Sequence, residues 1–258
     1  MRIVEASFLA NATKRSGVFL LSDATPFEEL YERTRGAERR ILSDEQVAQL
    51  PDGTDLWNAD EWRIRARSAD RLVRALRGSD LGSRVLEVGC GNGWLSARLQ
   101  REGHEVLGID PFTAELEQAA RVFPNGPAFA RCDLLETGLP QEFFDIIVFA
   151  ASFQYFPDAQ KALARASSLL RPSGEIHVMD SVLYRSPVEK TGAEERSRKY
   201  YENLGVPEMH THYHAHAMDD LKGAHRVRVL SAPSGMERTL LRFGKLASPF
   251  THVLISAQ

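Results

Sequence analysis

One turn constrains the fold of this chain more than any other segment. The apolar run that begins at Val85 ends in Glu-x-Gly-x-Gly-x-Gly, and a helical pattern starts directly after Gly93. Glycines at alternate positions permit backbone angles that other residues avoid, and they let a ligand lie against bare main chain at the carboxyl end of a strand. The sequence therefore predicts a strand, a cofactor-binding turn and a helix, in that order.

The charge beside the turn indicates which kind of cofactor it binds. Glu87 lies two residues before the first glycine, Gly89. An ionised carboxylate only accepts hydrogen bonds, so it suits the cationic amino group of a ligand and would repel a pyrophosphate. A dinucleotide is therefore disfavoured, although the fingerprint Gly-x-Gly-x-x-Gly of dinucleotide-binding proteins occupies the same place in its fold.

The rest of the chain alternates short apolar runs with helical stretches. The spacing predicts a helix over Ala59–Leu76, then crossover helices over Gly93–Glu102, Thr113–Phe123 and Asp158–Leu170, whereas the crossover around Leu134–Phe143 is short and loop-like. Strands are predicted over Arg84–Val88, Glu105–Ile109, Ala128–Arg131, Asp145–Phe149, Glu175–Met179, Arg226–Leu230 and His252–Ile255. This order favours an α/β fold with a doubly wound, seven-stranded, mostly parallel sheet and helices on both faces.

With its companion segments, the turn resembles the signature of the class I S-adenosylmethionine-dependent methyltransferases, an acidic residue followed by Gly-x-Gly-x-Gly. Gly108-Ile109-Asp110 ends the second predicted strand with an acid, and Arg131-Cys132-Asp133-Leu134 follows the third. Two later segments, Phe144–Phe156 and Leu169–Glu175, are also similar to those of the family. The resemblance covers roughly residues 81 to 180 and extends to the last two strands only as a pattern.

The resemblance implies a Rossmann-like fold, S-adenosylmethionine as cofactor, and three acidic contacts to it. Glu87 would bind the amino group, Asp110 the two ribose hydroxyls, and Asp133 the adenine amino group. The cofactor-binding residues that it implies are Glu87, Gly89, Cys90, Gly91, Gly93, Asp110, Pro111, Cys132, Asp133, Leu134 and Ala150. A simpler alternative stays open for Asp110 and Asp133, since an aspartate at a strand-to-helix turn often caps the helix that follows.

The segments around the core indicate an enclosed acceptor site. Residues 1–80 are expected to form a mostly helical N-terminal cap and residues 81–258 the methyltransferase domain, with an insertion at about 182–222 as a lid. Trp57 and Trp62 either stack on a ligand or anchor the cap to the core. Arg63 or Arg67 could reach the carboxylate of the cofactor.

A run of four histidines at alternate positions lies in this insertion, ending at His216. In an extended chain their side chains would point to one face. His210, His212 and His214 are candidate catalytic residues on the acceptor side, because imidazole is the side chain best matched to proton transfer near neutral pH. In that interpretation Tyr200, Tyr201 or Tyr213 would shape the pocket. Two other interpretations stay open: zinc or iron ligands, and hydrogen-bonded loop residues. No metal is assigned to the site.

Composition bears mainly on partners and location. The net charge of −3, with no polybasic run, disfavours nucleic acid as a partner, and no signal peptide or membrane span is visible. Cys90 and Cys132 make neither a disulfide framework nor a zinc knuckle and are expected to be small buried side chains. We therefore expect a cytoplasmic protein with no membrane partner, and the sequence assigns no oligomeric state.

Together these observations predict a methyltransferase that uses S-adenosylmethionine to methylate a small-molecule acceptor. The neutral-to-acidic balance and the cap with its lid favour a compact acceptor over a polymer. Two alternatives remain: a regulatory or scaffold protein that binds the cofactor without turnover, and a nucleotide-dependent oxidoreductase.

Overall fold

The computed structural model describes residues 3–77, 82–136, 138–223, 225–243 and 247–257. Its centre is one sheet, in the order β1-β2-β5-β4-β3-β6-β7-β11-β10. The strands of this sheet are β1 Thr13–Arg15, β2 Val18–Leu20, β3 Arg84–Val88, β4 Glu105–Asp110, β5 Ala128–Arg131, β6 Phe144–Ala150, β7 Leu170–Met179, β10 His225–Ser231 and β11 His252–Ala257. The doubly wound α/β fold expected from the sequence is confirmed.

Parallel pairing runs from β2 through β5, β4, β3 and β6 to β7. The last strand, β11, inserts between β7 and β10 and is antiparallel to both. Every predicted strand is present. The sheet is nonetheless larger than the seven strands expected, because the hairpin of β1 and β2 adds two strands beside β5.

The N-terminal segment is therefore not only a helical cap. It contains a 3-10 turn η1 Ile3–Glu5 and the helices α1 Ser7–Ala10, α2 Glu28–Ala37, α3 Asp44–Gln49 and α4 Ala59–Leu76. The β-hairpin between α1 and α2 was missed because each strand has three residues, too few for an alternating pattern to show. The expected boundary between residues 80 and 81 lies outside the described residues.

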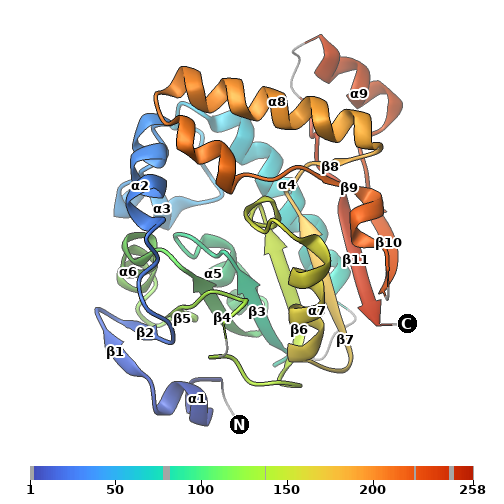
Figure 1. Ribbon diagram of the computed structural model, residues 1–258. Helices are drawn as coiled ribbons and strands as arrows, with labels where there is room; N and C mark the ends of the chain where they lie inside the picture. The colour runs from blue at the N-terminus through green and yellow to red at the C-terminus, as the bar shows by residue number, and fades with distance from the viewer. Residues whose placement is uncertain (1–2, 78–81, 137, 224, 244–246, 258) are drawn as a thin grey trace.

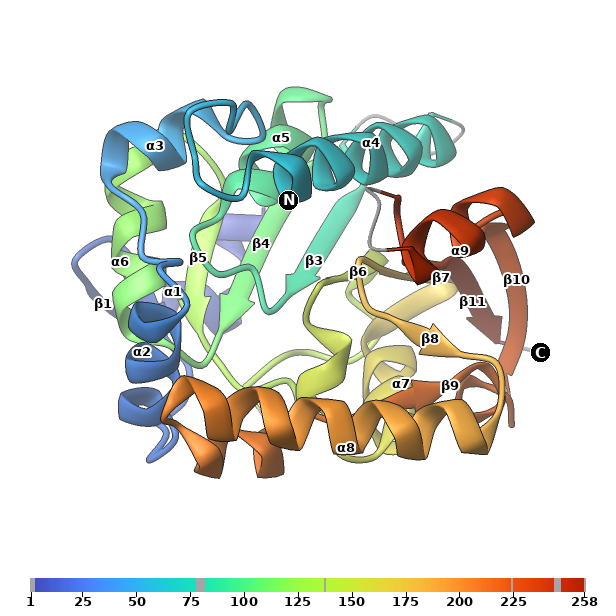
Figure 2. The same ribbon diagram turned by 90° about the horizontal axis from the view of Figure 1, so that it is seen from above.

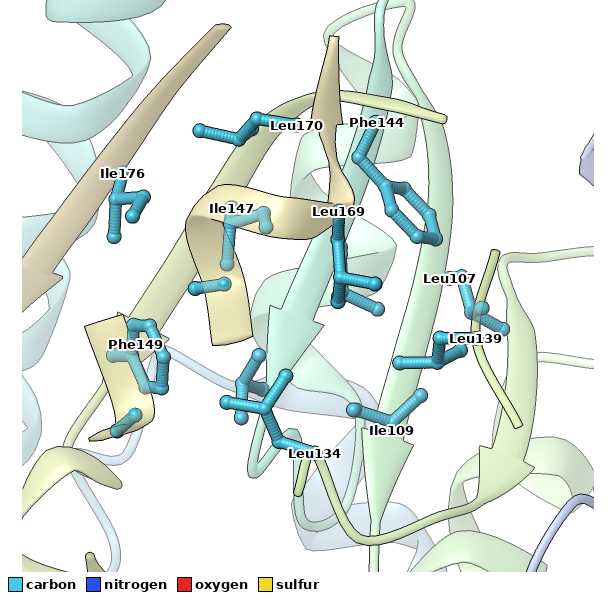
Figure 3. Packing of buried hydrophobic residues seen from close by; sticks show 14 of the residues in the cluster. Leu107, Ile109, Leu134, Leu139, Phe144, Ile147, Phe149, Leu169, Leu170 and Ile176 are labelled. Atoms are coloured by element: carbon cyan, nitrogen blue, oxygen red, sulfur yellow. The ribbon is translucent and has the colours of Figure 1, made fainter. Parts of the chain in front are cut away.

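Helices cover both faces of the sheet because the central strands bury side chains on both faces. On β6, Ile147 and Phe149 join a core cluster with helix α7 (Ala159–Leu169), whereas Ile146 and Val148 join a second cluster with α4 and α5 (Trp94–Arg101). Figure 3 shows the first cluster, where side chains of β4 and β6 meet Leu169 and the loop residues Leu134 and Leu139. Helix α6 (Thr113–Val122) packs against Phe129. The crossover from residue 132 to 143 has no helix among its described residues, as predicted.

The insertion between β7 and β10 lies over the carboxyl ends of the parallel strands. Its elements are β8 Leu183–Tyr184, α8 Pro187–Leu204, η3 Pro207–His212, β9 His216–Ala217 and η4 Met218–Leu221. Ser186 begins α8 by accepting a hydrogen bond from the backbone of Glu189, and Gly205 ends it with a φ of 80°. Helix α8 crosses above the sheet in Figure 1, and Figure 2 shows α2, α4 and α8 arranged around the strand ends. Helix α9 (Gly235–Arg242) lies between β10 and β11 in the chain.

Candidate active site

A cavity of about 850 Å³ opens at the carboxyl ends of the parallel strands. Its floor is formed by the turns after β3, β4, β5 and β6, and its walls by residues of α2, α4, η2 (Phe153–Tyr155) and α8. The volume falls within the range of small-molecule sites. The cofactor turn predicted from the sequence and the cap therefore enclose one space.

The glycine turn has the backbone that its sequence requires. Gly89, Gly91 and Gly93 have φ values of 71°, 49° and 75°, in the left-handed region that favours glycine. A Cβ on Gly89 would lie 2.4 Å from Cβ of Ser152, and one on Gly93 would lie 2.5 Å from the Phe129 ring. The turn is thus held against β5 and the end of β6, with bare backbone toward the cavity.

Two buried carboxyl groups lie under this turn. Glu87 accepts a hydrogen bond from the hydroxyl of Ser96, and burial raises its pKa to about 8. Asp110 accepts from the backbone N–H of Gly91 at 2.9 Å and of Phe112 at 3.0 Å. Burial, with the charge of Glu115, raises the pKa of Asp110 to about 7. Each carboxylate keeps lone pairs for a ligand.

The remaining cofactor residues predicted from the sequence line the same cavity, with one exception. Cys90, Gly91, Pro111, Cys132, Asp133, Leu134 and Ala150 all border it, together with Glu87, Gly89 and Asp110. Gly93 does not, because it begins α5 behind the turn. Asp133 accepts from the backbone N–H of Leu135 at 2.8 Å, which closes a local turn; no helix follows it among the described residues up to β6, so it does not act as a helix cap. Both cysteines are free and buried, as expected.

The cap contributes different residues from those singled out in the sequence. Trp62 lines the cavity and packs edge-on against Trp94, so it does anchor the cap to the core. Trp57 is exposed, and neither Arg63 nor Arg67 is among the described residues that line the cavity. Instead, Arg40 and Arg65 reach it, and both pair with Glu61.

The histidines do not form one stripe. Residues Pro207–His212 fold into a 3-10 helix, and the chain is not extended there, so successive side chains diverge. His210 is exposed, with Nδ1 2.6 Å from the carbonyl oxygen of Pro207. His212 lines the main cavity and stacks on Phe27 at 4.0 Å.

The other two histidines follow η3 in the chain. His214 borders a small pocket of about 20 Å³ beside the main cavity. His216 is buried, with Nε2 2.9 Å from the carbonyl oxygen of Phe156. Among the described residues, no group of three or more His, Cys, Asp or Glu side chains is placed to hold a metal ion.

Asp180 borders the cavity but had no signal in the sequence, whereas Ser152 and Tyr155 lie in the family-like segment Phe144–Phe156. Asp180 follows β7 with a φ of 54°; its carboxylate is buried and has no hydrogen-bond partner among the described residues. Burial raises its pKa. Ser152, packed against Gly89, and Tyr155 on η2 also border the cavity. A single aspartate carries no spacing that would distinguish it in a sequence.

Comparison with known proteins agrees with this geometry. Residues 86–178 match the family described as a methyltransferase domain. This matched segment begins in the strand before the glycine turn and contains Asp110, Asp133 and the strand β6. These residues form a methyltransferase domain of the class I S-adenosylmethionine-dependent type.

Curated relatives of this methyltransferase cover different shares of the chain. An uncharacterized methyltransferase of Geobacillus kaustophilus is 29% identical over 63% of this chain and 81% of its own. A ubiquinone biosynthesis O-methyltransferase of Bradyrhizobium diazoefficiens is 34% identical over 42% of this chain and 43% of its own. The methyltransferase thus matches less than half of the length of the second relative.

Solved structures share the fold of the methyltransferase at low sequence identity. The geranyl diphosphate C-methyltransferase of Streptomyces coelicolor, crystallised with Mg²⁺, geranyl diphosphate and S-adenosyl-L-homocysteine, has a TM-score of 0.61 at 15% identity; the match covers 92% of this chain and 99% of that one. A methyltransferase of Mesorhizobium loti has a TM-score of 0.56 at 20% identity, over 74% and 99%.

S-adenosylmethionine is the cofactor of this methyltransferase, and the cavity suits its chemistry. The cofactor carries a sulfonium and an ammonium group, and the floor of the cavity presents the acidic side chains of Glu87, Asp110 and Asp133. No described helix is both long and apolar enough to cross a membrane.

Proposed function

We propose that this methyltransferase transfers the methyl group of S-adenosylmethionine to a small molecule bound in the cavity under α2, α4 and α8. The observation that carries the proposal is that one cavity contains both the glycine-turn floor and the cap. Its volume of about 850 Å³ accommodates a cofactor together with a compact acceptor. The relatives named for ubiquinone biosynthesis and for geranyl diphosphate methylation support an acceptor of this size.

Three acids at successive strand ends, Glu87, Asp110 and Asp133, form a cradle that would orient the cofactor. Glu87 would hold the amino group, Asp110 the ribose hydroxyls, and Asp133 the adenine amino group. When bound, the cofactor supplies an electrophilic methyl group on a sulfonium. Transfer breaks the bond between sulfur and the methyl carbon and forms one to the acceptor, which loses a proton if it was protonated.

The chain itself contributes positioning and exclusion of water. Methyl transfer gains much of its rate from holding the nucleophile in line and from desolvating the reacting groups. The helices of the cap and the insertion contribute to both, because α2, α4 and α8 are arranged around the strand ends (Figure 2). Of the three histidines considered for catalysis, His212 borders this cavity and is the candidate to receive a proton.

The test is a methyl-transfer assay with the full chain against a metabolite extract, following release of S-adenosylhomocysteine. We expect release that depends on the extract, and at least a several-fold weaker affinity for S-adenosylmethionine in Asp110→Ala. Tight cofactor binding with no release in any extract would favour the regulatory or scaffold alternative. Unchanged affinity in Asp110→Ala would remove this residue from the ribose role.

Thermal unfolding with S-adenosylmethionine or NAD tests the oxidoreductase alternative. A ligand present at one hundred times its Kd stabilises the folded state by about 2.7 kcal/mol. We expect S-adenosylmethionine to raise the melting temperature and NAD to leave it unchanged. Stabilisation by NAD alone would overturn the proposal. We further propose a cytoplasmic location, with which two free, buried cysteines agree.

A further inference from the structure

The six tyrosines of the chain all line the cavity. Four of them, Tyr31, Tyr155, Tyr201 and Tyr213, form a group that we call the tyrosine cluster. They come from α2, η2, α8 and the residue after η3. The fold thus gathers phenol side chains from four separate segments in one part of the cavity wall.

The rings of the tyrosine cluster pack against one another. Tyr155 contacts Tyr213 edge-to-face at 6.0 Å and Tyr31 at 6.0 Å, and Tyr201 contacts Tyr213 at 5.9 Å. Tyr31 also stacks on Phe112 at 3.8 Å. Since these contacts use the ring surfaces, the cluster offers a ligand its hydroxyl groups more than open aromatic faces, which recognition of a cation by π-electrons would need.

Three of the four hydroxyls are available. Tyr31 donates to Glu115 at 3.4 Å, but the hydroxyls of Tyr155, Tyr201 and Tyr213 make no hydrogen bond within the described part of the chain. These three are also not among the fully buried polar atoms without a partner, so they open to the cavity. These hydroxyls can therefore form hydrogen bonds with a ligand in the cavity without breaking a bond within the described protein.

The available groups on this side are phenol hydroxyls, which both donate and accept hydrogen bonds. Burial, together with the neighbouring phenols, raises the pKa of Tyr201, and burial raises that of Tyr213 to about 12, so both hydroxyls stay protonated near neutral pH. A ligand hydroxyl can also donate and accept, whereas an ammonium group only donates and leaves the phenol O–H groups without an acceptor.

The surrounding charges disfavour an anion. Arg35 pairs with Glu115 at 3.0 Å, Arg40 with Glu61 at 2.8 Å, and Arg65 with Glu61 at 2.8 Å. The fourth arginine that borders the cavity, Arg196, is exposed on α8. Asp180 adds a carboxylate with no hydrogen-bond partner in the described structure. An anionic ligand would be repelled by the nearby carboxylates, and three of the four named arginines are already paired with acids.

We propose that the tyrosine cluster is the acceptor-binding subsite and that it takes a neutral, hydroxylated compound. A hydroxyl group can both accept from and donate to the tyrosine hydroxyls, so it matches the groups that open to the cavity. The inference rests on the proposed function, because it names the acceptor class for the same cavity. It goes beyond that function in assigning Tyr155, Tyr201 and Tyr213 to recognition of the acceptor.

The experiment titrates four small probes into the full chain, with and without saturating S-adenosylhomocysteine, by calorimetry or ligand-observed NMR. Catechol and methyl α-glucoside are neutral and hydroxylated, one planar and one not, and benzoate and benzylamine carry opposite charges. We expect catechol or methyl α-glucoside to bind at least about tenfold more tightly than either charged probe. The comparison of these two neutral probes tells an aromatic from an aliphatic acceptor.

Hydroxyl deletions then test the assignment. Tyr201→Phe and Tyr213→Phe keep the ring packing, and each should weaken the bound neutral probe about three- to tenfold, the usual effect of losing one such hydrogen bond. Tyr200→Phe is the comparator, because its hydroxyl already donates to Glu38 at 2.9 Å; its loss should be smaller. S-adenosylhomocysteine should bind all three variants as it binds the parent chain.

Three outcomes would overturn the assignment: tighter binding of benzoate or benzylamine, no binding of either neutral probe, or equal losses in all three variants. Failure of S-adenosylhomocysteine to bind the parent chain would instead contradict the proposed function. Binding of a neutral probe that still depended on Tyr201 and Tyr213 would then leave the subsite standing without the cofactor.

Discussion

At Gly93, both the backbone conformation and the space for a side chain require glycine. Its φ of 75° lies in the left-handed region, and a Cβ there would meet the Phe129 ring at 2.5 Å and Cβ of Ala119 at 2.9 Å. Both neighbours belong to the core packed beneath the turn. Glycine is needed at this position for backbone conformation and for space together, although the residue does not border the cavity.

Gly93→Ala should therefore lower the free energy of unfolding by about 2 kcal/mol or more, since it combines backbone strain with overpacking. Gly205→Ala is the matched control, because Gly205 has a φ of 80° but nothing within 4 Å of an added Cβ. That change should cost only about 1 kcal/mol. Urea denaturation of both variants measures the difference, and equal losses would show that packing at Phe129 is unimportant.

Because the carboxyl groups of Glu87 and Asp110 have raised pKa values, we expect cofactor binding to depend on pH. Burial raises the pKa of these carboxyls to about 8 and about 7 in the free protein. The cationic amino group favours an ionised Glu87, so binding should release protons near pH 7, and affinity should rise as the pH increases from 6 to 8.

Calorimetry at pH 6.5 in buffers of different ionisation enthalpy measures this proton release directly. In Glu87→Gln the upper part of the pH dependence should disappear. An affinity for S-adenosylmethionine that stays constant between pH 6 and 8 would contradict the assignment of these two acids to the cradle.

At the scale of elements, the cap is tied to the core by helix-to-helix contacts that include charges. Arg35 of α2 pairs with Glu115 of α6 at 3.0 Å, and both side chains are largely buried. Tyr31, one turn earlier on α2, donates to the same carboxylate. Glu115 therefore holds α2 over the strand ends, and the cavity wall depends on it.

Glu115→Gln should destabilise the fold by about 2 kcal/mol, because it leaves the buried guanidinium of Arg35 without its counter-charge. Asp44→Asn breaks a comparable pair with Arg121 between α3 and α6 that is exposed, and it should change stability little. Hydrogen exchange of α2 amides should also become faster in Glu115→Gln alone. Unchanged exchange would mean that packing of Phe27 and Tyr31 holds α2 without the ion pair.

At the scale of the whole molecule, the buried carboxylate of Asp180 in the cavity wall should lower the free energy of unfolding in a pH-dependent way. An acid whose pKa is raised on folding binds its proton more tightly in the folded state. The resulting loss of folding stability is absent below the pKa of an unfolded aspartate, near 3.9. It grows as the pH rises toward the folded pKa of Asp180, which is raised, and it is complete above that pKa.

Asp180→Asn should accordingly stabilise the protein at pH 8 by about 1 to 3 kcal/mol, and this gain should shrink toward pH 4. Asparagine also tolerates the left-handed φ of 54° at this position. Thermal unfolding of both proteins across this pH range is the measurement. A variant less stable than the parent at pH 8 would show that Arg65 and Arg71 already compensate the charge of Asp180.

The order and type of the central elements could be read from the sequence. Apolar runs such as those around Val85 and Ile147 are long, branched and separated by turns, and local pattern decides such strands. The glycine turn, Glu87, Asp110 and Asp133 could be located for the same reason. Their positions follow from where parallel strands end, and those ends meet at one edge of the sheet.

Only the tertiary structure decided what surrounds that edge. The three-residue strands β1 and β2 form because β5 offers them an open edge, and the 3-10 turn after Pro207 disperses histidines that alternate in sequence. The tyrosine cluster joins residues as distant as Tyr31 and Tyr213. The chain by itself therefore determined the fold and the methyl donor, which depend on local periodicity and on one contiguous turn. The acceptor side depends on long-range packing of the cap and the insertion, which leaves no regular spacing in the sequence.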